Sequence, residues 1–218
     1  MKNNKGIIYI LIALGALFYF FANFQRIAIP GAVFDLLQQE LAVSAPYITA
    51  FGAIFMYLYA VNQLIIGVLV DRYGGLRVML TGGIILGIGA LLFPISTNLP
   101  LMYFSRVLVG VGGSCFYLSL IRELRECFSD KNFGIAISVM LCIGYCGGIA
   151  ANAPFVFMMK YMNWRTILVV LASIILLGVL LFIILSFKVK FPEINRNVKL
   201  RTLPFRLVLH KKHNRNLF

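Results

Sequence analysis

Gly67-Val68-Leu69-Val70-Asp71-Arg72-Tyr73-Gly74-Gly75-Leu76-Arg77 lies between two long apolar stretches and decides how the rest of the chain is interpreted. The segment is short, charged and rich in glycine. The stretches on either side are free of charged residues over about 20 positions, which is the length that a helix needs to cross the hydrocarbon core of a bilayer. The segment therefore indicates a tight turn between two membrane-spanning helices.

The composition places the whole chain in a lipid environment. Hydrophobic residues make up 61 % of it, charged residues 12 %, and the mean hydropathy is +0.92. A soluble domain carries about 25 % charged residues. The chain has 20 Lys and Arg against 7 Asp and Glu, an excess that in a soluble protein points to nucleic acid. In so apolar a chain it indicates cationic loops beside a bilayer, and we expect no nucleic-acid partner.

Six apolar stretches are long enough to span, at about 7–29, 46–69, 76–96, 100–121, 134–158 and 164–187. Because lipid cannot hydrogen-bond an open backbone edge, they are predicted to be helices, and the fold class is an all-α membrane protein. Residues 1–187 form this bundle, and residues 188–218 form a basic tail. The first stretch is too long for a signal peptide and lacks a cleavage site, so it is interpreted as an uncleaved span.

The basic residues predict the orientation. All but four of them lie on the side that holds the N-terminus and the tail, and the four exceptions are Arg26, Arg106, Lys160 and Arg165. Loops rich in Lys and Arg stay in the cytoplasm. Both termini are therefore predicted to be cytoplasmic, in a bacterial inner membrane.

The opening segment resembles the G-x-x-x-D-R/K-x-G-R/K-x-R/K loop of the major facilitator superfamily. The matching positions are Gly67, Asp71, Arg72, Gly74 and Arg77. Gly75 departs from the pattern, because the family usually has a basic residue there. Gly67 is expected to allow close helix contact and Gly74 a tight turn, while Asp71 can face a helix N-terminus or an arginine. In the family this loop grips a helix of the second half, so its residues are predicted to act in conformational switching; the alternative is that the charges only close a short loop.

Two further motifs support the resemblance. Arg106-x-x-x-Gly110-x-Gly112 is similar to a family signature in the fourth span, which adds Arg106 to the switch residues, and Asn163-Trp164-Arg165 is similar to the start of the sixth. A weak repeat also relates Arg72-Tyr73 and Arg77 to Lys160-Tyr161 and Arg165, in loops on opposite sides of the membrane. This is the trace of an inverted-topology repeat. The resemblance implies a 3+3 inverted-repeat bundle, half of a twelve-helix fold, with the tail as central loop.

Arg26 is the leading candidate for contact with a solute. A charge at the membrane centre costs about 2.5–3.5 kcal/mol, so a charged residue in a span is expected to serve a function. No acidic residue accompanies Arg26 before Asp35. If the first helix continues to Asp35, Arg26 lies between the midplane and the outer edge, where a guanidinium can hold a carboxylate or phosphate bidentately. Its place also resembles that of an arginine in organic-anion carriers of the superfamily; the alternative is an arginine that snorkels to the headgroups.

Further polar residues lie within the spans. Those predicted to line the solute pathway are Asn23, Gln63, Tyr117 and Asn152, and Tyr59 and Tyr145 are additional polar groups. Each is equally suited to an interhelical hydrogen bond. Arg106, near the outer end of the fourth span, is interpreted as a snorkelling or structural residue rather than a solute contact.

The spans lack the residues that proton coupling, metal binding and catalysis require. The seven carboxylates fall in loops or at helix ends, and His210 and His213 lie in the tail, so the chain offers no proton relay within the membrane. The four cysteines have neither CxxC spacing nor histidine partners, and we expect no disulfide, metal or cofactor. Without a histidine before the tail, a membrane-embedded protease is disfavoured, and no enzymatic activity is expected.

The leading function is transport of a small solute, an organic anion, by alternating access in one half of a secondary carrier. Such a carrier needs a second six-helix bundle, as its own copy or a separate chain. One alternative is a truncated, non-transporting fragment or membrane scaffold. Another is a drug or cation exporter, which is disfavoured because Gly144-Tyr145-Cys146-Gly147-Gly148 replaces the G-P-x-x-G-G element of such exporters.

Overall fold

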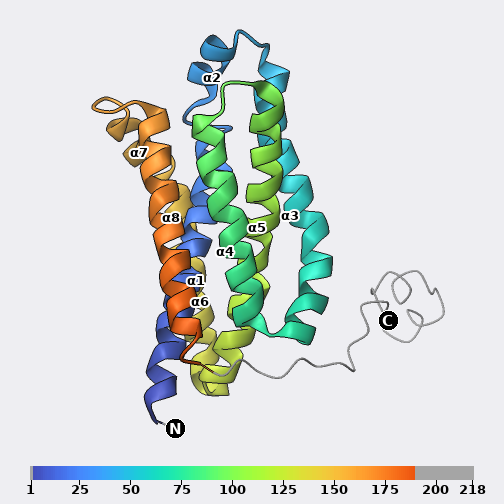
Figure 1. The fold of residues 1–218 in the computed structure, drawn as a ribbon, viewed down its shortest axis with the longest axis vertical. Helices are drawn as coiled ribbons and strands as arrows, with labels where there is room; N and C mark the ends of the chain where they lie inside the picture. The colour runs from blue at the N-terminus through green and yellow to red at the C-terminus, as the bar shows by residue number, and fades with distance from the viewer. Residues whose placement is uncertain (1, 190–218) are drawn as a thin grey trace, which may run out of the picture.

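The computed structural model describes residues 2–189, and within that range every regular element is a helix (Figure 1). The helices are α1 (Lys2–Ala28), α2 (Phe34–Leu41), α3 (Ala45–Tyr73), α4 (Gly75–Ile95), α5 (Leu99–Cys127), α6 (Asp130–Ala150), α7 (Ala153–Met158) and α8 (Trp164–Ser186). The predicted tail falls almost entirely outside the described residues. Figure 1 shows α2 and α7 at one end of the bundle, called here the α2 end, and the α3–α4 turn at the opposite, N-terminal end.

Six helical stretches are long and apolar enough to cross a membrane, which confirms the predicted all-α membrane fold. They are Gly6–Ala28, Ala45–Tyr73, Gly75–Ile95, Leu99–Cys127, Asp130–Met158 and Trp164–Ser186. The two short helices belong to the α2 end: α2 connects the first two spans, and α7 completes the fifth.

The helices pack closely where glycine lets two backbones approach. A Cβ at Gly112 of α5 would lie 2.5 Å from the backbone nitrogen of Leu86 in α4, and a Cβ at Gly147 of α6 would strike the carbonyl of Phe20 in α1. In lipid, such small residues take over the role that apolar burial plays in water. Glycine thus brings α4 close to α5 and α1 close to α6.

Burial is uneven around the bundle. In the most apolar part of each span, 61 % of the residues of α5 and 56 % of those of α4 are buried, against only 17 % of those of α3 and 28 % of those of the fifth span. Helices α3 and α6 therefore present wide faces that nothing within the described chain covers.

The first helix ends close to the predicted end of the first span and does not continue to Asp35. Helix α1 ends at Ala28, a turn follows, and α2 is a separate helix, so the condition that the first span continues to Asp35 is wrong. Pro30 explains the end, because proline lacks an amide donor and its ring disfavours helical geometry in the preceding residue. Arg26 consequently lies in the last turn of α1.

The fifth span is broken rather than continuous. Helix α6 ends at Ala150 and α7 begins at Ala153, with Pro154 in its first turn. A proline ring clashes with the carbonyl four residues earlier, which forces the interruption. The Asn152 side-chain amide donates a 2.8 Å hydrogen bond to the Gly148 carbonyl and so satisfies an acceptor beside the break.

Candidate functional site: a charged turn and a polar seam

A single residue connects α3 to α4. Gly74 has φ 87° and ψ 153°, a conformation that residues with a side chain rarely adopt. Its amide donates a 2.9 Å hydrogen bond to the Val70 carbonyl and closes the end of α3. Gly74 thus makes possible the abrupt reversal that the sequence pattern indicated.

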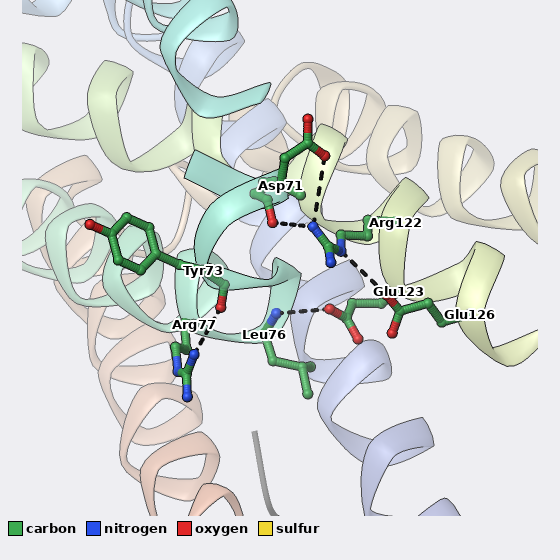
Figure 2. A network of polar contacts seen from close by, with 8 residues as sticks. Asp71, Tyr73, Leu76, Arg77, Arg122, Glu123 and Glu126 are labelled. Atoms are coloured by element: carbon green, nitrogen blue, oxygen red, sulfur yellow. Dashed lines mark hydrogen bonds and ion pairs between the residues drawn. The ribbon is translucent and has the colours of Figure 1, made fainter. Parts of the chain in front are cut away.

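Arg122, near the end of α5, holds the C-terminal end of α3. Its guanidinium donates to the Val70 carbonyl, lies 3.7 Å from an Asp71 carboxylate oxygen and pairs with Glu126 at 3.3 Å (Figure 2). The C-terminus of a helix carries partial negative charge, which a cation stabilises. Arg122 therefore caps the helix end and lies near the Asp71 carboxylate.

Glu123, the next residue of α5, holds the start of α4. It is 3 % exposed, and its carboxylate accepts a 3.0 Å hydrogen bond from the Leu76 amide (Figure 2). A carboxylate at a helix N-terminus complements the positive end of the dipole. Neighbouring residues of opposite charge thus complement the two helix ends that meet at this turn.

The structure meets one of the two expectations for Asp71 and gives the other role to Glu123. Asp71 faces an arginine, as one of its two expected options had it, whereas Glu123 occupies the helix N-terminus. On sequence alone, Glu123 was grouped with the other carboxylates that lie in loops or at helix ends. A signal was present in the apolar pattern, because Glu123 follows Phe116 by seven residues and Leu120 by three and therefore shares a helix face with these apolar residues.

Gly75 departs from the family pattern for a steric reason. A Cβ there would lie 2.6 Å from both a Glu123 carboxylate oxygen and the Ser119 carbonyl. The carboxylate of α5 thus fills the space into which the usual basic side chain would project. Gly67 differs, because a Cβ there would lie 3.8 Å from Leu118, an ordinary contact. Close packing inside this bundle does not require glycine at that position.

Gly67 instead lines a surface groove between α3 and α5. The groove is also lined by Val70, Asp71, Leu118, Ile121, Arg122, Arg125 and Glu126. The Asp71 side chain is 71 % exposed there. The other basic residues stay close to the turn: Arg77 donates to the Tyr73 carbonyl at 3.2 Å, and the Arg72 guanidinium lies 5.3 Å from the Tyr73 ring centre.

Arg106 does not snorkel. It is fully buried, its Nε donates to the Phe51 carbonyl at 3.3 Å, and its guanidinium carbon lies 5.4 Å from the Phe55 ring centre and 5.9 Å from that of Phe93. Its two terminal nitrogens have no hydrogen-bond partner among the described residues. Arg106 is therefore enclosed within this bundle, away from the turn and from any exposed face.

Three predicted pathway residues gather on one side of the bundle. Arg26 lies within electrostatic reach of Tyr19 and Tyr59. The Tyr117 ring centre lies 6.3 Å from that of Tyr19, and Gln63 lies beside Tyr59 while donating to the Ser114 carbonyl at 3.3 Å. This group, with Arg26 at one end, is called the polar seam.

The two predicted asparagines are turned toward their own helices. Asn23 is 5 % exposed and donates a 2.9 Å hydrogen bond to the Tyr19 carbonyl. Asn152 lies at the break before α7, where its amide is bonded to Gly148. Tyr19, which the sequence interpretation missed, is central to the seam. Only its hydroxyl set it apart from the aromatic run around it.

A second charged cluster lies at the α2 end. Arg165 pairs with Glu40 at 2.8 Å and donates to the Pro94 and Ser96 carbonyls at 2.5 and 2.7 Å. Its guanidinium also lies 4.6 Å from the Trp164 ring centre. Arg165 thus ties α2, the end of α4 and the start of α8 together.

Metal-ligand chemistry finds no support in the described part of the chain. No three residues of the His, Cys, Asp and Glu types come together there as a metal site would require. The four cysteines, all within residues 2–189, are free thiols.

The chain is similar to several transporters, among them three bacterial proteins. The glucose transporter GlcP of Staphylococcus epidermidis is 29 % identical over 81 % of the chain, and the probable sulfoacetate transporter SauU of Cupriavidus necator is 21 % identical over 84 %. The 3-(3-hydroxy-phenyl)propionate transporter of Escherichia coli is 30 % identical over 49 %. The aligned part is 39 %, 42 % and 26 % of these proteins. The chain thus spans less than half the length of the relatives it matches.

The family comparison agrees with the fold and the turn. The model of the Major Facilitator Superfamily matches residues 12–217, which includes all of the candidate site residues. Together with the six membrane-length helices, this match shows that the chain is an integral membrane protein that belongs to the Major Facilitator Superfamily of transporters.

Proposed function

We propose that this chain forms one half of a secondary carrier that moves a small organic anion by alternating access, without a catalytic step. The observation that carries the proposal is Arg26. It is a half-buried guanidinium at the end of the polar seam, and no ion pair joins it to a carboxylate of the described residues. A cation in that position is well suited to a carboxylate or sulfonate of the solute.

The second half is proposed to be another six-helix bundle, as a copy of this chain, a separate chain or further sequence of a longer protein. The poorly buried faces of α3 and α6 support it, since both lie beside the seam. The groove beside Gly67 offers a place for a helix of that bundle, with the exposed Asp71 carboxylate at its edge. A helix N-terminus docked there would bring its positive dipole end to Asp71.

The proposed membrane orientation follows from the basic residues. The N-terminal end, with the α3–α4 turn, faces the cytoplasm of a bacterial cell, and the α2 end faces outward across the inner membrane. Arg26 then meets solute from the outside. The exchange of access between the two sides occurs by movement of this bundle against the second one.

Neutral sugar transport is the second candidate, because one similar protein is named as a glucose transporter. The two candidates differ in their need for Arg26. An anion carrier requires the guanidinium charge, whereas a sugar carrier binds through amides and hydroxyls such as those of Gln63 and the tyrosines. A charge-removing substitution therefore separates the two.

Uptake into proteoliposomes tests the proposal, with the protein in the form that the cell produces. Labelled sulfoacetate, 3-phenylpropionate and glucose are compared for the wild type, Arg26→Lys and Arg26→Ala. We expect acid uptake that falls at least 100-fold in Arg26→Ala, and less in Arg26→Lys, because the charge stays while the bidentate fork is lost. The matched control is Lys160→Ala, a basic residue of the α2 end outside the seam. Glucose uptake that is indifferent to Arg26→Ala, with no uptake of either acid, would establish the sugar carrier instead.

A further inference from the structure

Four tyrosines lie near the middle of four different spans. They are Tyr19 of α1, Tyr59 of α3, Tyr117 of α5 and Tyr145 of α6. With a rise of about 1.5 Å per residue, each lies within about 8 Å of the midpoint of its helix or span. Carriers with internal repeats bind their solutes near this depth. The tyrosines thus place hydroxyl groups where hydrocarbon would otherwise surround the helices.

The four side chains converge on Tyr19. Its ring fills the space that a Cβ at Gly144 would need, which brings it next to Tyr145, and its ring centre lies 6.3 Å from that of Tyr117. Tyr59 stacks on Phe55 with ring centres 5.9 Å apart and lies within electrostatic reach of Tyr19 and Tyr117. The rings are therefore positioned by packing, which fixes where the hydroxyls lie.

Exposure separates the packed part of this group from the part a solute can reach. Tyr19 is 6 % exposed, Tyr59 and Tyr117 are half-buried, and Tyr145 is 57 % exposed. Each phenol hydroxyl can both donate and accept a hydrogen bond. A hydroxyl that faces an apolar solute remains unpaired, which costs about 1–3 kcal/mol for each buried group. The group is consequently suited to a solute that carries hydroxyls.

The separation between the charge and the hydroxyls sets the shape of such a solute. Arg26 lies two helical turns beyond Tyr19, about 10 Å of helix rise. A long side chain on a helix leans toward the N-terminus of that helix, so the guanidinium reaches back toward Tyr19 and shortens the gap. Tyr19 and Tyr59 both lie within electrostatic reach of Arg26. One small molecule can therefore touch the cation and the phenols together.

We infer that the solute is a hydroxylated carboxylate, whose acid group binds Arg26 and whose hydroxyl groups bind the tyrosines at mid-membrane. This inference rests on the proposed function, and it adds what the rest of the solute must be. A site built to pair with hydroxyls rejects an analogue that lacks them far more strongly than an apolar pocket rejects an extra methylene. The tyrosines are thus specificity-determining residues, and the arginine is the anchor.

Matched pairs of acids test the inference by equilibrium binding to the purified protein in lipid nanodiscs. The aliphatic pair is gluconate and hexanoate, and the aromatic pair is 3-(3-hydroxyphenyl)propionate and 3-phenylpropionate. We expect the hydroxylated member of at least one pair to bind at least 10-fold more tightly than its partner. Equal affinities within both pairs would overturn the inference but leave the proposed anion carrier standing, provided that Arg26→Ala abolishes binding. Absence of binding by all four acids would overturn the proposed function as well.

Phenylalanine substitutions locate the preference. Tyr59→Phe and Tyr117→Phe remove one hydroxyl each and keep the ring, so the fold is preserved. Each is expected to reduce affinity for the hydroxylated acid about 5–100-fold, the range for one lost hydrogen bond, and to leave the deoxy acid unaffected. Tyr57→Phe is the control, because Tyr57 lies on the same helix and is 74 % exposed. A preference that persists in the double variant of Tyr59 and Tyr117 would overturn the role of the tyrosines.

Discussion

The two ends of the bundle secure their turns in different ways. At the N-terminal end, adjacent residues of α5, Arg122 and Glu123, complement the two helix ends that meet at Gly74. At the α2 end, a single residue, Arg165, binds a carboxylate from one segment and two carbonyls from another. The first arrangement depends on shape and helix dipoles, and the second depends on one multidentate side chain.

The difference shows which end is open to another partner. The Arg165 side chain is 20 % exposed, and its donors are engaged within the bundle. Asp71, by contrast, is 71 % exposed, and its contact with Arg122 is 3.7 Å long. A long, exposed ion pair contributes little to stability. The α2 end is thus fastened within the bundle, whereas the N-terminal end retains a carboxylate that can change partners.

Substitution of Gly75 should have the largest effect, because the N-terminal turn depends on shape. Gly75→Ala introduces a Cβ against the Ser119 carbonyl, and we expect a loss of about 3 kcal/mol in the free energy of unfolding. Unfolding of the purified protein in mixed micelles with increasing SDS measures it. The matched control is Gly67→Ala, which has room for the methyl group and is expected to be neutral or to gain about 0.5–1 kcal/mol. Equal effects at the two positions would show that shape is not what holds this turn.

Removal of Arg165 should weaken the opposite end by a smaller amount. Arg165→Ala leaves the Pro94 and Ser96 carbonyls and the Glu40 carboxylate without their donor, and we expect a loss of about 2 kcal/mol. The same unfolding assay applies. Lys160→Ala serves as the control, because Lys160 faces the Phe157 ring rather than a carboxylate. A loss below that of the control would mean that the α2 end is held by apolar packing alone.

Neutralising Glu123 tests the helix-dipole part of the comparison. Glu123→Gln keeps an acceptor for the Leu76 amide but removes the charge at the start of α4, with an expected loss of about 1 kcal/mol. Glu126→Gln is the matched control, because Glu126 lies one turn away and its side chain is 51 % exposed. If both substitutions lower the free energy of unfolding by the same amount, the charge of Glu123 does not stabilise the start of α4 more than an exposed carboxylate would.

Asp71→Asn should have the smallest effect on stability. We expect a change below about 0.5 kcal/mol, because its ion pair is long and exposed. Turnover in the proteoliposome assay should nonetheless fall several-fold, with little change in solute affinity, if the carboxylate contacts the second bundle in one access state. Normal turnover in this variant would indicate that the α3–α4 turn only connects the two helices.

Much of the fold could be predicted from sequence because lipid imposes a simple rule. Apolar length alone identifies the six spans, and Gly74 and Asp71 mark the turn. The interruptions were harder. Pro30 and Pro154 carry the signals for the end of α1 and the break before α7, but each lies in an apolar context where hydropathy continues past it.

The candidate site was less predictable, because it depends on which helices meet. Arg26, Gln63 and Tyr117 come together from three helices, and nothing local in the sequence encodes that meeting. Asn23 has the same polarity but turns to its own helix. Arg106 shows the limit most clearly: its charge suggested exposure to headgroups, whereas the rings of Phe55 and Phe93 enclose it.

The break before α7 has a consequence for the membrane around the protein. With 21 residues, α6 is already about 31 Å long, close to the thickness of the hydrocarbon core, so we expect α7, at the α2 end of the fifth span, to lie where the headgroups begin. Phe157 and Tyr161 are 56 % and 74 % exposed, and their ring centres lie 5.3 Å apart. Aromatic side chains of this kind anchor a protein at the interface. We expect this pair to mark the interface at the α2 end, so that in a thinner bilayer the bundle tilts or the surrounding lipid thickens.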